Sequence, residues 1–142
     1  MKIEGEKELK TKLTAIGDYI KIPKKSLKEA ILMWKDTTEK EVFDSEGSSM
    51  SKRWTRLSPS YAKVKRWKYP GKGILEASGK MRKNFKTKVS STRAILSNPT
   101  SYFKYHQLGT RKMPQRQVLH LDSKRVKETE KIFNKDIDKI LK

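Results

Sequence analysis

Hydrophobic residues recur at helical spacing at the start of the chain. Leu9, Leu13, Ile16 and Ile20 lie three or four residues apart, which predicts an amphipathic helix over residues 6–20. The positions between them are mostly charged or polar. A helix of this kind needs a neighbouring element or subunit to cover its apolar stripe.

A second amphipathic helix is predicted after the break at Pro23. Ser26 and Glu29 have the spacing of a capping box, which predicts that the helix begins there. Its apolar stripe consists of Leu27, Ile31, Trp34, Thr38 and Val42. Trp34 is expected to fill the core or a subunit interface. The helical pair over residues 1–43 is expected to be a scaffold or an oligomerisation element.

Turn-forming and cationic residues dominate the next part of the chain. The composition of residues 44–53 predicts a flexible loop. Ser58 and Pro59 then have the pattern of a helix N-cap and a first helical residue. The short helix is expected to turn Tyr61, Val64 and either Trp67 or Lys68 inward. The rest of its surface is expected to carry Lys63, Lys65, Arg66 and Lys68.

Alternation replaces helical spacing after residue 81. Phe85, Thr87 and Val89 alternate with lysines, which predicts a half-exposed strand. A turn over residues 90–92 and a second strand over residues 93–97 are predicted to follow. A short segment rich in leucine and valine, residues 117–121, predicts a third strand.

The final element predicted is a helix over residues 124–141, capped by Asp122 or Ser123. One face of this helix carries Val126, Thr129, Phe133, Ile137, Ile140 and Leu141. The predicted fold class is α+β: a small, mainly antiparallel sheet packed with N-terminal and C-terminal amphipathic helices. We expect a single domain over residues 1–142, with the α+β body over residues 54–142.

Residues 101–121 combine aromatic, basic and chain-breaking residues. Tyr102, Phe103 and Tyr105 are placed to form a short helix, and Gly109 is predicted to close it at positive φ. The segment continues with a basic tip and a proline that prevents further helix, namely Arg111, Lys112 and Pro114. The predicted order is therefore helix, stop, projecting basic loop and strand.

The positive charge of the chain is concentrated in its middle. The net charge is +19, and residues 51–121 carry 18 lysine and arginine residues against one acid, Glu76. Residues 1–50 carry ten lysines and ten acids. Such a surface favours an acidic partner, either nucleic acid or an anionic protein face, and we favour the protein.

The residues that catalysis would need are sparse. Cysteine is absent, and the two histidines, His106 and His120, belong to no recognisable ligand set. His106 is expected to have a hydrogen-bonded structural role. Glu76 is the only carboxylate in the basic middle, which excludes paired-carboxylate chemistry there. We therefore predict no enzymatic activity, no catalytic or metal-binding residues, no cofactor and no membrane span.

Three segments resemble one protein family. The pattern Tyr105-His106-Gln107, Gly109, Pro114 and Arg116 resembles the C-terminal signature of the phage virion morphogenesis proteins, the tail-completion and head–tail joining proteins of Mu-like tailed phages. Two further segments resemble motifs of this family, Trp54-x-x-Leu57-Ser58-Pro59-x-Tyr61 and Leu75-x-x-Ser78-Gly79-x-Met81. The chain departs from the family where it has Gln117-Val118 instead of the usual Pro-Phe, and where Phe103 replaces a small residue.

The resemblance implies a structural virion protein that is made in the host cytoplasm and resides at the neck or tail end. It implies a homo-oligomeric ring that contacts other phage neck or tail proteins and that can also reach packaged DNA. The candidate interface residues are Trp54, Leu57, Tyr61, Tyr69, Gly71, Tyr102, Tyr105, His106, Gln107, Gly109, Arg111, Lys112 and Arg116. The candidates to face an acidic partner or DNA are Lys63, Lys65, Arg66, Lys68 and Lys72.

The alternative is a basic nucleic-acid-binding protein. In this interpretation the surface of residues 51–121 tracks a phosphate backbone with its cations. The aromatic residues among those cations, which would stack on bases, are Trp54, Tyr61, Trp67 and Tyr69. No recognisable nucleic-acid-binding motif accompanies them.

Overall fold

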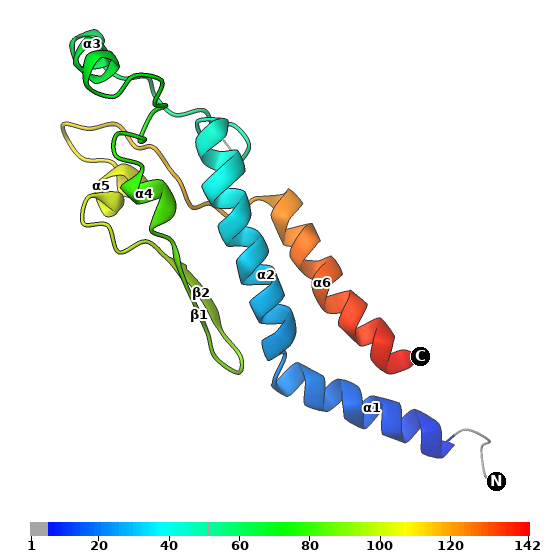
Figure 1. The fold of residues 1–142 in the computed structure, drawn as a ribbon. Coiled ribbons are helices and arrows are strands. Elements are labelled where there is room, and N and C mark those ends of the chain that lie inside the picture. Colours follow the sequence, from blue (N-terminus) through cyan, green and yellow to red (C-terminus); the bar gives the residue numbers. More distant parts are fainter. Residues whose placement is uncertain (1–5, 51) are drawn as a thin grey trace.

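The computed structural model describes residues 6–50 and 52–142 of the chain. The fold is a small α+β fold that is mostly helical (Figure 1). Its elements are α1 (Glu6–Lys21), α2 (Lys24–Thr37), the π-helical turn η1 (Thr38–Val42), α3 (Pro59–Lys68), α4 (Lys80–Lys83), β1 (Lys86–Val89), β2 (Ala94–Ser97), α5 (Phe103–Leu108) and α6 (Ser123–Leu141). The predicted fold class is confirmed.

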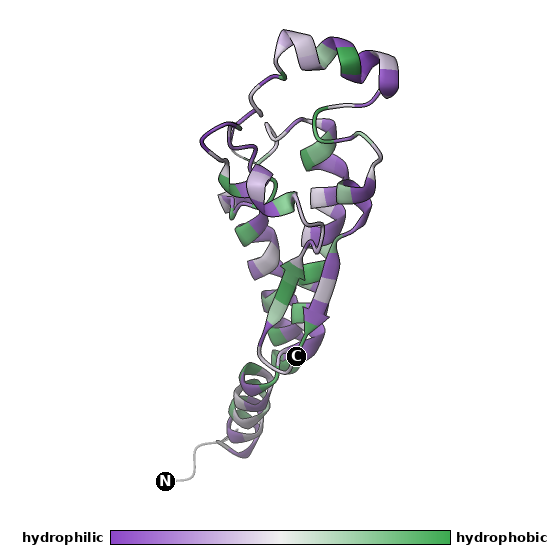
Figure 2. Cartoon of the chain, turned by 90° about the vertical axis from the view of Figure 1, so that its left-hand side faces the viewer, coloured by the Kyte–Doolittle hydropathy of each residue, from purple (hydrophilic) through white to green (hydrophobic). Residues whose placement is uncertain are grey.

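Helix α2 is the centre of the arrangement. It packs against α6 on one side and against both strands on the other (Figure 1). The molecule is elongated, with α3 at one end and α1 at the opposite end in both views (Figures 1 and 2). The long helices therefore extend beyond the part of the molecule that holds the hydrophobic core.

The first two helices form as predicted, but the predicted start of the second is wrong. Helix α2 begins at Lys24, two residues before Ser26, and has no side-chain cap. Ser26 is instead fully buried, and its Oγ donates a hydrogen bond to Asp136 Oδ2 of α6 at 2.7 Å. Tyr19 Oη of α1 lies within hydrogen-bond distance of the same Oγ. A serine that joins three helices is therefore unavailable as a cap.

Polar bonds also join the C-terminal part of α2 and η1 to the N-terminal part of α6. Trp34 Nε1 donates to Thr129 Oγ1 at 2.9 Å, which links α2 to α6. At the start of α6, Asp122 accepts from the backbone N–H of Arg125 and is the N-cap, as one of the two predicted alternatives has it. The guanidinium of Arg125 is only 1% exposed and pairs with Asp122 and with Glu41 of η1. Charged and hydroxyl groups therefore join these elements here, in addition to apolar contacts.

The two strands form one antiparallel hairpin, in the register Lys86↔Ser97 to Val89↔Ala94. The predicted third strand over residues 117–121 is wrong, because these residues join no sheet within the described part of the chain. Their backbone bonds to the side chain of Gln107 instead. Gln107 Oε1 accepts from the N–H groups of Val118 and Leu119 at 2.9 and 3.0 Å, and its Nε2 donates to Leu119 O at 2.7 Å. A single side-chain amide supplies the bonds that a neighbouring strand would have supplied.

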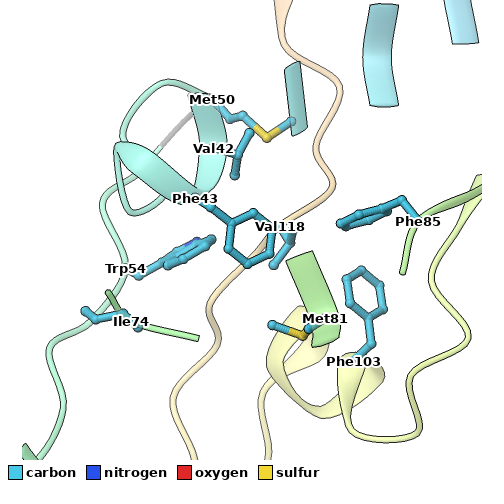
Figure 3. Close-up of a cluster of buried hydrophobic side chains, with 9 residues drawn as sticks. All are labelled: Val42, Phe43, Met50, Trp54, Ile74, Met81, Phe85, Phe103 and Val118. Atoms are coloured by element: carbon cyan, nitrogen blue, oxygen red, sulfur yellow. The ribbon is translucent and has the colours of Figure 1, made fainter. Parts of the chain in front are cut away.

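The hydrophobic core lies at the α3–α5 end of the molecule, where loops from distant parts of the chain meet. Figure 3 shows the ring of Phe43 between Trp54 and Phe85. Edge-to-face contacts continue from Phe43 to Trp54 (5.5 Å between ring centres) and from Phe85 to Phe103 (5.9 Å). The full cluster is Val42, Phe43, Met50, Trp54, Ile74, Met81, Phe85, Phe103 and Val118.

The loop predicted over residues 44–53 is a packed turn in its described part; Ser51 lies outside the described residues. Gly47 N donates to Val42 O, and Trp54 N donates to Glu46 O at 2.7 Å. Gly47 has φ +88°, and a Cβ there would lie 2.5 Å from Trp54 Nε1. The turn therefore needs a glycine both for its backbone angle and to let the indole approach.

Candidate partner-binding site

The three segments that carry the family resemblance line one cavity. It has a volume of about 660 Å³ and is open to solvent. Its lining comes from residues 56–65, from residues 75–81 and from residues 102–116. These segments are far apart in the sequence, so their meeting is a property of the fold.

Arg116 holds the first and third segments together. Its Nε donates to Thr55 O at 2.8 Å and its Nη2 to Arg56 O at 3.2 Å. Its backbone N–H donates to His106 O. Trp54 makes a second link, because its Nε1 donates to Gln117 O at 2.7 Å. These bonds fix the loop after α5 against the chain before α3.

Gly109 determines where the basic loop leaves α5. The helix ends at Leu108, and the N–H of Gly109 donates to Tyr105 O. Gly109 has φ +74° and ψ 170°, so the predicted positive φ is confirmed, but ψ is extended rather than that of a left-handed helical cap. A Cβ at this position would lie 3.0 Å from the backbone nitrogen of Gln115. The glycine is required because the backbone of Gln115, where the chain returns from the loop, lies directly over it.

Helix α3 presents a different face from the predicted one. Ala62, Lys65 and Tyr69 point inward at helical spacing, whereas Tyr61 and Val64 are 50% and 56% exposed. Lys65 is only 6% exposed, and its Nζ donates to Gly73 O. Burial lowers the pKa of Lys65, Glu76 and Glu46 offset part of this effect, and Arg116 adds to it. The prediction that Lys65 faces a partner in the same way as its neighbours is therefore corrected.

The cavity is positively charged. Among the described residues, its lining includes no aspartate or glutamate and five cationic residues, which are Arg56, Lys65, Lys80, Lys112 and Arg116. Arg116 is 5% exposed and forms no ion pair among the described residues, and burial lowers its pKa.

His106 lies in the wall of this cavity beside Arg116. Burial lowers the pKa of its imidazole first, and the charge of Arg116 lowers it further. Nδ1 of His106 is shielded from solvent and has no hydrogen-bond partner in the described part of the chain. The expectation of a hydrogen-bonded structural histidine is therefore wrong for this nitrogen. The ring does pack edge-to-face on Tyr102, with 6.2 Å between ring centres.

The other candidate residues divide into internal and exposed groups. Trp54 and Arg116 are buried, and Gln107 bonds within the chain, so these three stabilise the protomer from inside. The candidates brought together at the cavity are Leu57, Tyr61, Lys65, Tyr102, His106, Lys112 and Arg116. The candidates that do not line it are Lys63, Arg66, Lys68, Tyr69, Gly71, Lys72, Tyr105, Gly109 and Arg111.

Sequence reasoning missed several residues of the cavity. Arg56 and Lys80 lie at variable positions inside the quoted motifs and belong to no periodic pattern. Met113 directly follows the basic residues Arg111 and Lys112, and only those charges were considered as contacts. Their position within the motif segments was the available signal. Only the approach of the three segments shows that they share a wall.

Two apolar surfaces on the other half of the molecule are uncovered. Leu9, Leu13 and Ile20 form a stripe along α1, and each is at least 60% exposed. Figure 2 shows α1 projecting from the narrow end of the molecule. A groove of about 720 Å³, lined mainly by apolar side chains of α2, β2, α6 and residues 119–121, is also open. Uncovered apolar surface of this kind is typical of proteins that associate.

Comparisons with known proteins make no assignment for this chain. No protein-family model, no curated protein and no solved structure matches it. Within residues 6–50 and 52–142, histidine, aspartate and glutamate residues nowhere gather in a group of three that could hold a metal ion. None of the described helices combines the length and apolar character needed to cross a bilayer.

Proposed function

We propose that this protein is a structural virion assembly protein of a tailed phage that acts in tail completion and head–tail joining. The observation that carries the proposal is the cavity: the three segments that resemble the virion morphogenesis family converge on it from distant parts of the sequence. In this proposal the protein is a subunit of a ring at the neck or the tail end. The cavity and the basic loop after α5 are its contacts with a neighbour.

The uncovered apolar surfaces support the ring. The stripe on α1 and the groove beside α6 are different surfaces at separate places on one protomer. Pairing of two different surfaces between copies is a heterologous contact, and it produces a closed ring when the rotation closes. A protomer that leaves both of these apolar surfaces open is suited to this mode of assembly.

The test is to remove the gene from the phage or prophage that encodes the protein and to examine the particles by electron microscopy. We expect heads and tails to accumulate unjoined, or tails of abnormal length. Adding the purified protein to these parts should restore complete particles. Normal, infectious virions in the absence of the protein would overturn the proposal.

A second candidate function is nucleic-acid binding, and α3 is the observation that favours it. Trp67 on this helix is 85% exposed, and Tyr61 is 50% exposed. Lys63, Arg66 and Lys68 are exposed on the same helix. Exposed aromatic rings among cations are suited to stacking on bases and neutralising phosphates.

Salt dependence distinguishes the two candidates. Contact with Z duplex phosphates makes log K fall against log salt with a slope of about −0.9Z, whatever the DNA sequence. A protein partner would also be weakened by salt, but its binding would not be displaced by added duplex. Tight duplex binding that is lost in the Trp67→Ala and Arg66→Gln variants, with particle assembly unaffected, would favour the second candidate.

A further inference from the structure

The cavity has two buried cations in its wall. Arg116 and Lys65 are 5% and 6% exposed, and within the described residues neither lies within 4.0 Å of a carboxylate oxygen. In the described part of the chain, the side chains of both donate hydrogen bonds only to backbone carbonyls. The charges of Glu46 and Glu76 raise the pKa of Lys65 from beyond ion-pair distance. Burial lowers the pKa of Arg116, and no described carboxylate offsets that effect. A buried cation without a counter-ion is unfavourable, and an incoming anion would relieve this.

The rim of the same cavity adds three exposed cations. Arg56, Lys80 and Lys112 line the opening, and none of them forms an ion pair with a described carboxylate. Because the lining contains no acid, the rim and the interior have the same sign of potential. A concave surface lined by charges of one sign concentrates the field and attracts an opposite charge.

The shape and the apolar part of the lining indicate which anion enters. The walls between the cations are formed by Leu57, Leu75, Met81, Met113 and Pro114. Duplex phosphates lie on a convex cylinder and are contacted by exposed side chains, so the recessed Arg116 is poorly placed for them. A peptide can insert one acidic group while its apolar neighbours pack against the walls.

We propose that this cavity binds a carboxylate carried by a peptide segment of a neighbouring protein, with Arg116 at its base, Arg56 and Lys112 at its rim and the apolar walls accepting adjacent side chains. The inference rests on the proposed function, because it names the chemistry of the neighbour. The carboxylate can be an acidic side chain or the C-terminus of a chain, since both offer the same two oxygens.

The experiment measures the binding of fluorescent peptides to the full chain by anisotropy. One peptide carries an internal glutamate between leucine and phenylalanine and has an amidated C-terminus. A second has glutamine in place of that glutamate and a free C-terminal carboxylate, and a third is the same neutral peptide with an amidated end. We expect the first or the second to bind and the third not to bind, and the comparison of the first two identifies the source of the carboxylate.

Two double variants remove the same charge at different places. Arg56→Gln with Lys112→Gln removes two of the three rim cations, and both side chains are exposed, so the fold should persist. Lys63→Gln with Arg66→Gln neutralises two exposed cations of α3 that do not line the cavity. We expect the first pair to weaken peptide binding roughly tenfold or more and the second pair to change it less than about twofold.

The inference is overturned if no acidic peptide binds, if both double variants weaken binding equally, or if duplex DNA displaces the peptide at equal charge. Particle assembly keeps this outcome separate from the proposed function. Failure of peptide binding in a protein that is still needed to join heads and tails would remove the inference and leave the function. Specific peptide binding in a protein that virions do not need would remove the proposed function and leave the cavity as a carboxylate-binding site.

Discussion

At the scale of single residues, the basic loop after α5 depends on one backbone position. Gly109 combines a positive φ with an extended ψ, a conformation that residues with a side chain adopt only under strain. The backbone of Gln115 lies over the same position at 3.0–3.1 Å from where a Cβ would be. Angle and space therefore both require glycine, and the loop that carries Arg111 and Lys112 follows from that requirement.

The Gly109→Val variant should lower the free energy of unfolding by at least about 1 kcal/mol, because a β-branched residue is strained at positive φ. Chemical denaturation monitored by circular dichroism measures the change. Gly17→Ala is the matched control, since Gly17 lies within α1 and an added Cβ there would meet no atom within 4 Å. That control should be stabilising by about 0.5–1 kcal/mol. Equal stability of Gly109→Val and the parent would remove the steric argument.

A pH dependence is expected from His106, whose pKa lies below its ordinary value of 6.5 because of burial and Arg116. As pH falls below about 6.5, the unfolded chain takes up a proton that the folded chain resists, so stability falls. Tyr102 and the cations Arg56, Lys65, Lys80, Lys112 and Arg116 face the same cavity, and none of them is an acid that would reverse the sign.

The measurement is urea denaturation of the parent and of His106→Asn at several pH values between about 7 and 5. The variant should lose less stability than the parent over this window, which lies above the range where most carboxylates titrate. His120 is present in both proteins and therefore cancels. Parallel curves for the two proteins would show that His106 is not the titrating group.

At the scale of elements, α6 is attached to α2 largely through polar groups. At its N-terminal end Arg125 is buried between Asp122 and Glu41. Near its C-terminal end Asp136 accepts from Ser26, and this hydrogen bond, as the largest cause, lowers the pKa of Asp136. Half-buried Phe133 lies between these two attachments and half-buried Ile137 directly follows Asp136, so the helix contacts its neighbours without being enclosed by them.

The Ser26→Ala variant should therefore be destabilising by about 1–3 kcal/mol, the range for removing one partner of a buried, charge-assisted hydrogen bond. It leaves Asp136 with Lys139 as its remaining side-chain partner among the described residues. Ser60→Ala is a suitable control, because Ser60 is exposed and has only a long contact of 3.4 Å with Ser58. Calorimetric unfolding of both variants gives the comparison. A loss no larger than that of the control would mean that the Ser26–Asp136 bond contributes little.

At the scale of the whole molecule, charge and uncovered apolar surface occupy different ends. The basic cavity and α3 lie with the core at one end, and the apolar stripe of α1 lies at the other (Figure 1). This separation is suited to the proposed assembly, in which one end would contact a neighbour of its own kind and the other end a different protein.

Association through α1 should respond to a single charge in the stripe. Leu13→Glu is expected to shift the protein toward the monomer at a given concentration, because it places a charge in an interface that must exclude water. Thr14→Glu adds the same charge at an exposed position away from the stripe and should leave association unchanged. Sedimentation velocity over a range of concentrations measures both. A parent protein that stays monomeric at all concentrations would contradict the predicted oligomer.

The sequence by itself determined the helices, the hairpin and the uneven charge. The first helix depends on contacts within a few residues, so the spacing of Leu9, Leu13 and Ile20 was sufficient to predict it. The strand around Thr87 also forms where it was predicted, but Thr87 is exposed like the lysines on either side of it. Gly109 could be predicted at positive φ for the same reason, since the end of a short helix is a local event.

Only the tertiary structure decided which groups are satisfied by distant partners. Ser26 was predicted to be a helix cap because its actual partner, Asp136, is 110 residues away in the sequence. Residues 117–121 were predicted to be a strand because nothing in their own pattern of side chains shows that the amide of Gln107 bonds to their backbone. Lys65 was predicted to be exposed like its neighbours because its hydrogen-bond acceptor, the carbonyl of Gly73, is brought near it only by a turn of the chain. The basic cavity arises in the same way, because its charge balance depends on three segments whose approach no local spacing encodes.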